Sequence, residues 1–197
     1  MTTFDFNDAG PQKSFDIIPA DVIATLHMKV KPGQAGEGSW LRRSKAGDSE
    51  ALDCEFVIID GEYARRKFWT LFTVNGTTEG QATAADVSRR RLRAMLESAR
   101  GIKPDDKSDA ANAARRTESW GAFDGLRFIG RIGIEPAKEN FKAKNTLAEV
   151  IVPGRKEWHH VDQVTKPDNT PTPGGSAAAV PHPASVTPAI ARPQWAS

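Results

Sequence analysis

The segment from residue 51 to residue 74 constrains the fold more than any other part of the sequence. Its first half carries apolar side chains at every second position: Leu52, Cys54, Phe56 and Ile58. This period of two is typical of a strand with one buried face. Asp60-Gly61 is a strong turn signal, and β-rich sequence resumes at 66–74. The segment therefore predicts an antiparallel hairpin.

Three more strands are predicted outside the hairpin. Residues 22–30 alternate apolar and polar side chains, and β-type segments follow at 126–134 and 147–152. A long loop rich in glycine and basic residues separates residues 22–30 from the hairpin. The strand order therefore places one strand before the hairpin and two after it.

A long helix is predicted between the third and fourth strands. Thr83 is its expected cap, with Asp86 in the capping-box position, and Gly101 is its expected C′ residue. One arc of the helix is apolar: Val87, Leu92, Met95, Leu96 and Ala99. The opposite face is basic: Arg89, Arg90, Arg93 and Arg100. A shorter helical piece is expected at about 108–116.

The resulting order, β-β-β-α-β-β, predicts a mainly β (α+β) fold of the OB type, a five-stranded, partly open barrel. We expect the barrel domain to span residues 15–152 after a flexible amino terminus at 1–14. Residues 153–197 are rich in Pro, Ala, Ser and Thr and predict a disordered tail. OB-folds commonly bind ligands across their second and third strands, flanked by the loops after the first and fourth strands.

Composition narrows the functional classes. The net charge is only +2, so a polyanionic partner must be argued from clusters of basic residues. The single cysteine, Cys54, and the absence of a signal-like start favour a cytoplasmic protein. No enzyme motif is present, and we expect no catalytic residues, metal or cofactor. His159-His160 with Asp162 is a weak metal candidate because a proline-rich flank offers no rigid scaffold.

Three basic clusters, each with an aromatic residue, fall on the segments where OB-folds bind ligands. Aromatic rings that stack on bases, beside basic side chains that contact phosphates, are typical of single-stranded nucleic-acid binding. The predicted contacts are Trp40, Arg42, Arg43, Lys45, Arg65, Arg66, Lys67, Trp69, Lys138, Phe141, Lys142 and Lys144. Taken singly, each cluster is more often structural, with packed rings and solvated bases. Their joint placement on the three ligand-binding segments of an OB-fold makes the binding interpretation about equal to the structural one.

The orientation of Trp69 decides between two readings of the hairpin. If Phe68, Thr70 and Phe72 face inward, Trp69 and Lys67 lie on the outer face of the barrel. In the opposite register, Trp69 belongs to the core. The arginine face of the helix also has three interpretations: a solvated face, an accessory phosphate contact or a surface for a partner protein.

Residues 15–152 resemble a phage and prophage family catalogued as domain of unknown function six-six-nine. The hairpin "EFVIIDGEYARRKFW" carries most of the resemblance, supported by "LRAMLESARGI" and "ENFKAKNTLAEV". The resemblance implies a product of a phage replication or recombination gene cluster, in which a single-strand-binding role is suspected. The chain departs from the family by a longer arm at 103–125 and by its proline-rich tail.

The leading hypothesis is a sequence-independent single-stranded DNA-binding protein of phage replication or recombination, acting in the bacterial cytoplasm. The alternative is an adaptor that docks a recombinase, helicase or host factor through the arginine face and Trp195 near the carboxyl terminus. The layout of the tail resembles that of bacterial single-strand-binding proteins, but it lacks their acidic tip.

Overall fold

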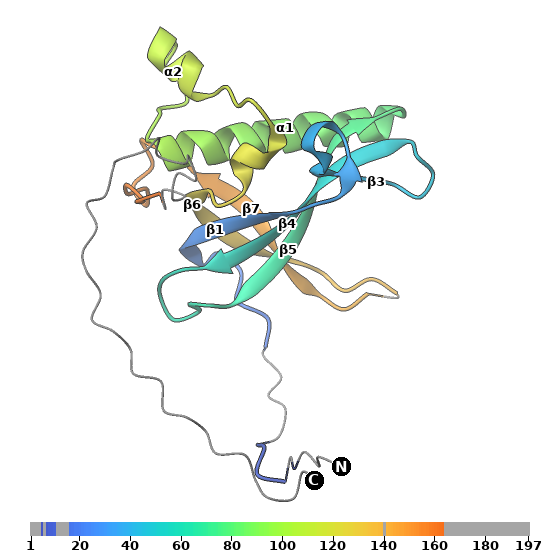
Figure 1. Ribbon diagram of the computed structural model, residues 1–197. Helices are drawn as coiled ribbons and strands as arrows, with labels where there is room; N and C mark the ends of the chain where they lie inside the picture. The colour runs from blue at the N-terminus through green and yellow to red at the C-terminus, as the bar shows by residue number, and fades with distance from the viewer. Residues whose placement is uncertain (1–4, 6, 11–15, 140, 164–197) are drawn as a thin grey trace, which may run out of the picture. The chain divides into compact units, whose positions relative to one another are not determined.

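The computed structural model describes residues 5, 7–10, 16–139 and 141–163 (Figure 1). The helical elements are η1 (Glu37–Ser39), α1 (Glu79–Arg100), α2 (Asp109–Ala114) and η2 (Trp120–Phe123). The strands are β1 (Ile23–Lys31), β2 (Gln34–Ala35), β3 (Leu41–Arg43), β4 (Ser49–Ile58), β5 (Lys67–Gly76), β6 (Arg127–Glu135) and β7 (Lys144–Ile151). Among the described residues, no helix is both long enough and apolar enough to cross a bilayer.

Five long antiparallel strands form the predicted OB-like frame. Their hydrogen-bonded order is β5-β4-β1-β6-β7, and α1 connects β5 to β6. The outermost strands, β5 and β7, approach each other, but within the described residues no strand pairing closes the sheet. The frame is therefore a partly open barrel with OB-type connectivity, as the order of the elements predicted.

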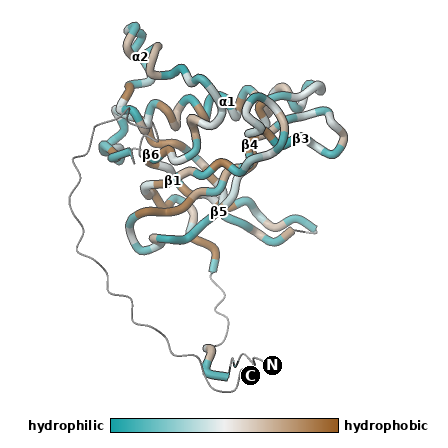
Figure 2. Tube along the Cα trace, viewed as in Figure 1, coloured by the Kyte–Doolittle hydropathy of each residue, from teal (hydrophilic) through white to brown (hydrophobic). Residues whose placement is uncertain are grey.

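Two short strands were not predicted. β2 and β3 form a small hairpin in the glycine-rich loop between β1 and β4, and β3 pairs with Glu50 and Ala51 of β4. Their apolar content is too small to produce an alternating pattern. The residues of this loop and of the turn after β3 are mostly hydrophilic (Figure 2).

The core follows the predicted alternation. Every second residue of β1 and β4 is buried: Ala24, Leu26, Met28, Val30, Leu52, Cys54, Phe56 and Ile58. Phe56 contacts three other rings, with centroid distances of 5.2 Å to Phe68, 6.2 Å to Phe72 and 5.8 Å to Phe128. Helix α1 packs against β5, β6 and β7 through its buried apolar residues. The hairpin and the helix therefore share one core.

The start of α1 differs from the prediction. Thr78, not Thr83, is the N-cap: its hydroxyl accepts from the Gln81 backbone N–H, and Gln81 Oε1 accepts from the Thr78 N–H at 3.1 Å. This reciprocal pair is a complete capping box. Thr83 lies inside the helix, where its hydroxyl donates to the Glu79 carbonyl at 3.0 Å. Val87, predicted to be buried, is 46% exposed. Gly101 ends the helix with a φ of 68°, as predicted.

The folded body continues past residue 152, where composition predicted it to end. Residues 153–163, here called the strap, lie beside α1 and β6 (Figure 1). Trp158 Nε1 donates to the Ser98 carbonyl at 3.1 Å, and Val161 is buried with Ile129 and Ile151. The strap thus forms a second, smaller hydrophobic cluster. The rest of the predicted tail, including Trp195, lies outside the described residues.

The strap is fixed at its end by a side-chain amide. Gln163 Oε1 accepts from the backbone N–H of Arg127 at 2.9 Å, and Gln163 Nε2 donates to the Arg127 carbonyl at 2.8 Å. One side chain therefore satisfies both backbone groups of a strand residue, as a neighbouring strand would.

Candidate nucleic-acid interface

Trp69 lies on the outer face of the barrel. Strand β5 turns Phe68, Phe72 and Val74 into the core, so that alternation places Trp69 and Leu71 on the opposite side. Their side chains are 47% and 54% exposed. Of the two registers considered from the sequence, the structure therefore has the one with Trp69 outside. Two large apolar side chains at positions i and i+2 make an exposed apolar strip along β5.

Basic residues border this strip at both ends. A hollow of about 240 Å³ lies beside Leu71 and Thr73 and contains Arg42, Arg43 and Lys45. A second hollow of about 260 Å³ lies beside Trp69, at the opening between β5 and β7. The basic residues that line the second hollow are Arg66, Lys67 and Lys144.

A third hollow extends the surface onto the loop between β6 and β7. It has a volume of about 340 Å³, shares Lys144 with the second hollow, and is lined also by Lys138, Phe141 and Lys142. Phe141 is 76% exposed. The outer residues of β5 and the three hollows form one surface, here called the β5 surface. It consists of Arg42, Arg43, Lys45, Arg66, Lys67, Trp69, Leu71, Thr73, Lys138, Phe141, Lys142 and Lys144.

The strap covers another part of the outer face of the sheet. Trp158 and Val161 cover Ile129 and Ile151, which point away from the main core. The part of the outer face around Ile129 and Ile151 is therefore covered by the chain itself. The outer face of β4 and β5 has no such cover among residues 16–139 and 141–163.

Acidic residues hold most of the bases of the β5 surface in place. Arg42 pairs with Asp53 at 3.4 Å, and Arg43 pairs with Glu50 at 3.0 Å. Lys67 Nζ lies 2.9 Å from Glu55 Oε1, and Glu135 pairs with both Lys138 and Lys144, at 3.6 and 3.1 Å. Exposed pairs of this kind contribute about 0–1 kcal/mol each, so a phosphate can replace the carboxylate at little cost.

The same contacts keep these carboxylates ionised. Hydrogen bonding from Lys67 lowers the pKa of Glu55, hydrogen bonding from Lys144 lowers that of Glu135, and hydrogen bonds from Asn75 and Arg43 lower that of Glu50. Lys45 and Lys142, in contrast, have no ion-pair partner within the described part of the chain. The surface thus carries more basic than acidic side chains, because two lysines are unpaired and one carboxylate, that of Glu135, is shared by two lysines.

Trp40 does not belong to the β5 surface. Its ring is half-buried against the core, and a Cβ added to Gly121 would lie only 2.6 Å from its Cε2 atom. Gly121 is in η2, so the indole packs between two loops that are distant in sequence. We therefore leave Trp40 out of the interface predicted from the sequence.

Arg65 also lies apart from the three hollows. It occupies the turn between β4 and β5 with a φ of 70°, and its N–H donates to the Ile58 carbonyl at 2.8 Å. Arg66, its neighbour, donates to the Asp16 carbonyl and lies 5.8 Å from the centre of the Tyr63 ring. The basic run of the hairpin is therefore divided: Arg66 and Lys67 line the interface, and Arg65 belongs to the turn.

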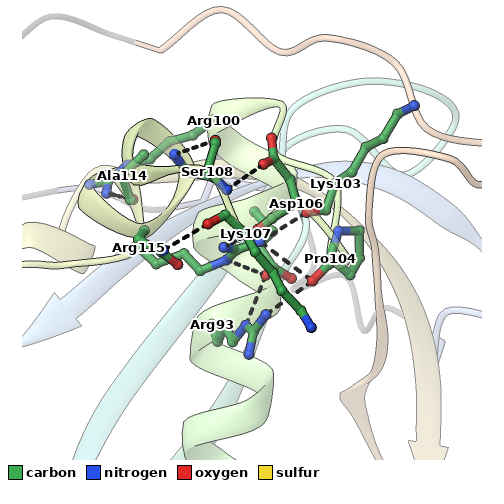
Figure 3. A network of polar contacts seen from close by, with 12 residues as sticks. Arg93, Arg100, Lys103, Pro104, Asp106, Lys107, Ser108, Ala114 and Arg115 are labelled. Carbon is green, nitrogen blue, oxygen red and sulfur yellow. Dashed lines mark hydrogen bonds and ion pairs between the residues drawn. The ribbon is translucent and has the colours of Figure 1, made fainter.

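The arginine face of α1 is largely engaged within the chain. Arg93 and Arg100 bind backbone carbonyls of the arm that carries α2, at Pro104 and Ala114 (Figure 3). Arg89 donates to the Val74 carbonyl at 2.9 Å. These contacts attach the arm and the end of β5 to the helix. A fourth interpretation is therefore added to the three predicted from the sequence: the arginines of this face stabilise the fold itself.

The metal candidate at His159, His160 and Asp162 receives no geometric support. In the described ranges there is no group of three or more His, Cys, Asp or Glu side chains placed to hold a metal ion. His160 lies 3.8 Å from Asp162, and both side chains are exposed. Cys54 is buried, and burial raises the pKa of its thiol far above neutrality. The thiol therefore stays protonated at neutral pH.

Sequence reasoning missed Leu71 and Thr73 of the β5 surface, and two contacts of Trp69. Leu71 shares the outer face with Trp69, and strand alternation in 66–74 was sufficient to place it there. Lys31 Nζ lies 5.6 Å from the centre of the Trp69 ring, and Glu55 is the cross-strand partner of Trp69. These two contacts depend on the register of three strands, which alternation does not specify.

The chain was also compared with known proteins. No protein-family model matches it, and no curated protein sequence matches it. The resemblance to family six-six-nine therefore stays a prediction, and the argument for function depends on the geometry of the β5 surface.

Proposed function

We propose that the β5 surface binds single-stranded nucleic acid without sequence preference, and that single-stranded DNA is its ligand. One observation carries the proposal: Trp69 is exposed on the open outer face, between hollows lined by basic side chains. Bases stack on such rings for about 1–3 kcal/mol each, while phosphates follow the bases. Because every base has a π-face, stacking of this kind does not select a sequence.

A duplex is a poorer ligand for this arrangement. In a duplex the bases are stacked on each other, so their faces are not available to Trp69 and Phe141. The basic side chains alone would bind a duplex through its phosphates, with an affinity that depends only on charge. The proposed preference for single strands therefore depends on the two exposed rings.

The resemblance to family six-six-nine supports the biological setting of the proposal. It favours a phage protein of DNA replication or recombination that works in the cytoplasm of a bacterial host. For the adaptor alternative, Arg89, Arg93 and Arg100 of α1 make contacts within the chain, and Trp195 lies outside the described residues.

Titration of a fluorescent oligonucleotide tests the function. We expect the chain to bind single-stranded DNA more tightly than the matching duplex. We also expect affinity to fall with salt, with a log–log slope of about −0.7 for each phosphate neutralised. An RNA strand of the same sequence measures the preference between the two nucleic acids. Absence of binding at low salt, or equal affinity for duplex, would refute the proposal.

Replacing Trp69 tests the stacking contact. We expect Trp69→Ala to weaken single-strand binding by about 1–3 kcal/mol, the range measured for one stacked base. Trp69→Phe should retain part of the affinity because it keeps an aromatic face. Ile59→Ala, at another exposed apolar residue, is the control and should bind normally. The stacking assignment is wrong if Trp69→Ala and Ile59→Ala bind equally well.

A further inference from the structure

The outer face of β1 lies beside the β5 surface and carries two exposed lysines. Met28 and Val30 point into the core, so alternation places Lys29 and Lys31 on the opposite side of the strand. Strands β1, β4 and β5 lie side by side in the sheet (Figure 1). Adjacent strands are about 4.8 Å apart, so β1 runs only about 10 Å from β5. Both lysines are therefore within reach of a ligand that is bound at Trp69.

The acidic residues between these lysines and β5 already have partners. The strand register places Glu55 of β4 between Lys29 and Trp69, and Asp53 opposite Lys31. Both carboxylates form ion pairs with bases of the β5 surface. Neither Lys29 nor Lys31 has an ion-pair partner in the part of the chain that the structure describes. The two ammonium groups can therefore bind phosphates without breaking an ion pair.

Lys31 contacts the ring of Trp69. Its Nζ lies over the ring, 5.6 Å from the ring centre, which is within the range of a cation–π contact. An exposed contact of this kind is weaker than the stacking of a base on the same ring. A base can therefore displace the ammonium from the ring. The released ammonium is then free to bind a phosphate of the stacked strand.

We propose that Lys29 and Lys31 extend the β5 surface across β4, and that Lys31 exchanges the Trp69 ring for a phosphate when single-stranded DNA binds. Lys31 thus covers the exposed indole in the free chain and contacts the nucleic-acid backbone in the complex. The bound strand reaches from β5 across β4 to β1. This inference rests on the proposed function of the β5 surface and adds two phosphate contacts to it.

Titration of a thymidine oligonucleotide against single-lysine variants measures these contacts. For Lys31→Ala we expect the salt slope to become shallower by about 0.7, because one phosphate contact is lost. The same slope predicts an affinity about fivefold lower at about 0.1 M salt and almost unchanged at about 1 M salt. Lys29→Ala should have the same effects, whereas Lys31→Arg keeps the charge and should keep the slope.

Lys107→Ala is the matched control. Lys107 is an exposed lysine of the arm that carries α2, and it too has no ion-pair partner within residues 16–139 and 141–163. Its removal should leave the affinity and the salt slope unchanged.

The exchange at Trp69 has a separate signal in nuclear magnetic resonance spectra. The ε-methylene protons of a lysine that lies over an aromatic ring are shifted upfield by the ring current. With isotope-labelled lysine, the Lys31 signal is assigned by its absence in Lys31→Arg. We expect it to be shifted upfield in the free wild type, and to return to the ordinary lysine position in Trp69→Ala or when the oligonucleotide is added. The Lys107 signal should not move.

The outcomes distinguish this inference from the proposed function. If the wild-type chain binds no oligonucleotide, the proposed function and the inference fail together. If it binds, but Lys29→Ala and Lys31→Ala keep its affinity and salt slope, the inference is overturned while the proposed function stands. Tighter binding by Lys31→Ala with an unchanged slope would show that this lysine only covers the ring. A Lys31 signal that does not move on binding overturns the exchange.

Discussion

A chain that ends at Val152 is expected to lose most of its stability, whereas a chain that ends at Val164 should fold like the full-length protein. The shorter chain lacks the strap, and thereby Trp158, Val161 and the Gln163 amide. It also exposes Ile129 and Ile151, which are both 0% exposed in the intact fold. Removal of a fully buried aromatic side chain costs about 3–5 kcal/mol, and the partly buried Trp158 is lost together with the buried Val161 and the Gln163 amide. Total stabilities are only about 5–15 kcal/mol, so the loss is a large fraction.

Urea denaturation followed by circular dichroism measures this difference. The chain that ends at Val164 is the control, because it keeps every described contact of the strap. Trp158→Ala in the full chain provides an intermediate case, and we expect it to cost about 2 kcal/mol, less than a fully buried aromatic because Trp158 is partly exposed. Equal midpoints for the two truncated chains would show that the strap is not part of the folded body.

The second large effect is expected at Glu97, which is 3% exposed beneath the arm that carries α2. Its Oε1 accepts from Arg93 Nε at 2.8 Å and from Arg115 Nε at 2.7 Å. Arg115 also donates to the carbonyls of Lys103 and Asp106, so that one carboxylate fixes the residue that organises the arm. Glu97→Ala leaves Arg115, whose side chain is 12% exposed, without its counter-charge. We expect a loss of about 3–5 kcal/mol.

Denaturation and amide hydrogen exchange measure this effect together. Exchange should accelerate first in α2 and in residues 103–108, because these depend on Arg115. Glu97→Gln keeps an acceptor and should cost less than Glu97→Ala. Asp86 forms an exposed ion pair with Arg90, one helix turn away. Asp86→Asn should therefore cost less than about 0.5 kcal/mol. Similar stability of Glu97→Ala and Asp86→Asn would contradict the account.

The frame was predictable because the alternation of apolar and polar residues along its strands shows which face of each strand is buried. In β1 and β4, alternation identified the inward side chains, and Asp60-Gly61 located the turn between β4 and β5. The order of elements then sufficed for an OB-type frame. The start of α1 was harder, since Thr78 and Thr83 are both plausible caps and only the Gln81 contact decides between them.

The strap could not be predicted from composition. Its proline- and glycine-containing beginning resembles the rest of the tail, and its few anchors do not form a periodic pattern. Trp158 and Val161 acquire their role only from Ile129 and Ile151, which lie on different strands. The same reason explains Trp40: its ring is covered by Gly121, about 80 residues further along the chain.

The candidate interface was predictable in its chemistry but not in its boundaries. The three basic clusters of the sequence contribute to one surface, because Lys144 is shared by two hollows and Leu71 adjoins Trp69 on β5. The acidic partners of these bases were not predicted. Glu55 and Asp53 alternate with buried residues on β4, and their pairing depends on register.

Photochemical crosslinking tests most directly whether the β5 surface holds single-stranded DNA. A single-stranded oligonucleotide containing iododeoxyuridine is irradiated with the full chain, and the crosslinked residues are mapped by mass spectrometry. Because the halogenated base reacts with rings in contact with it, we predict crosslinks at Trp69 and Phe141, and loss of the first in Trp69→Ala. Crosslinks concentrated on α1 or at Trp40, with none on β5, would contradict the account.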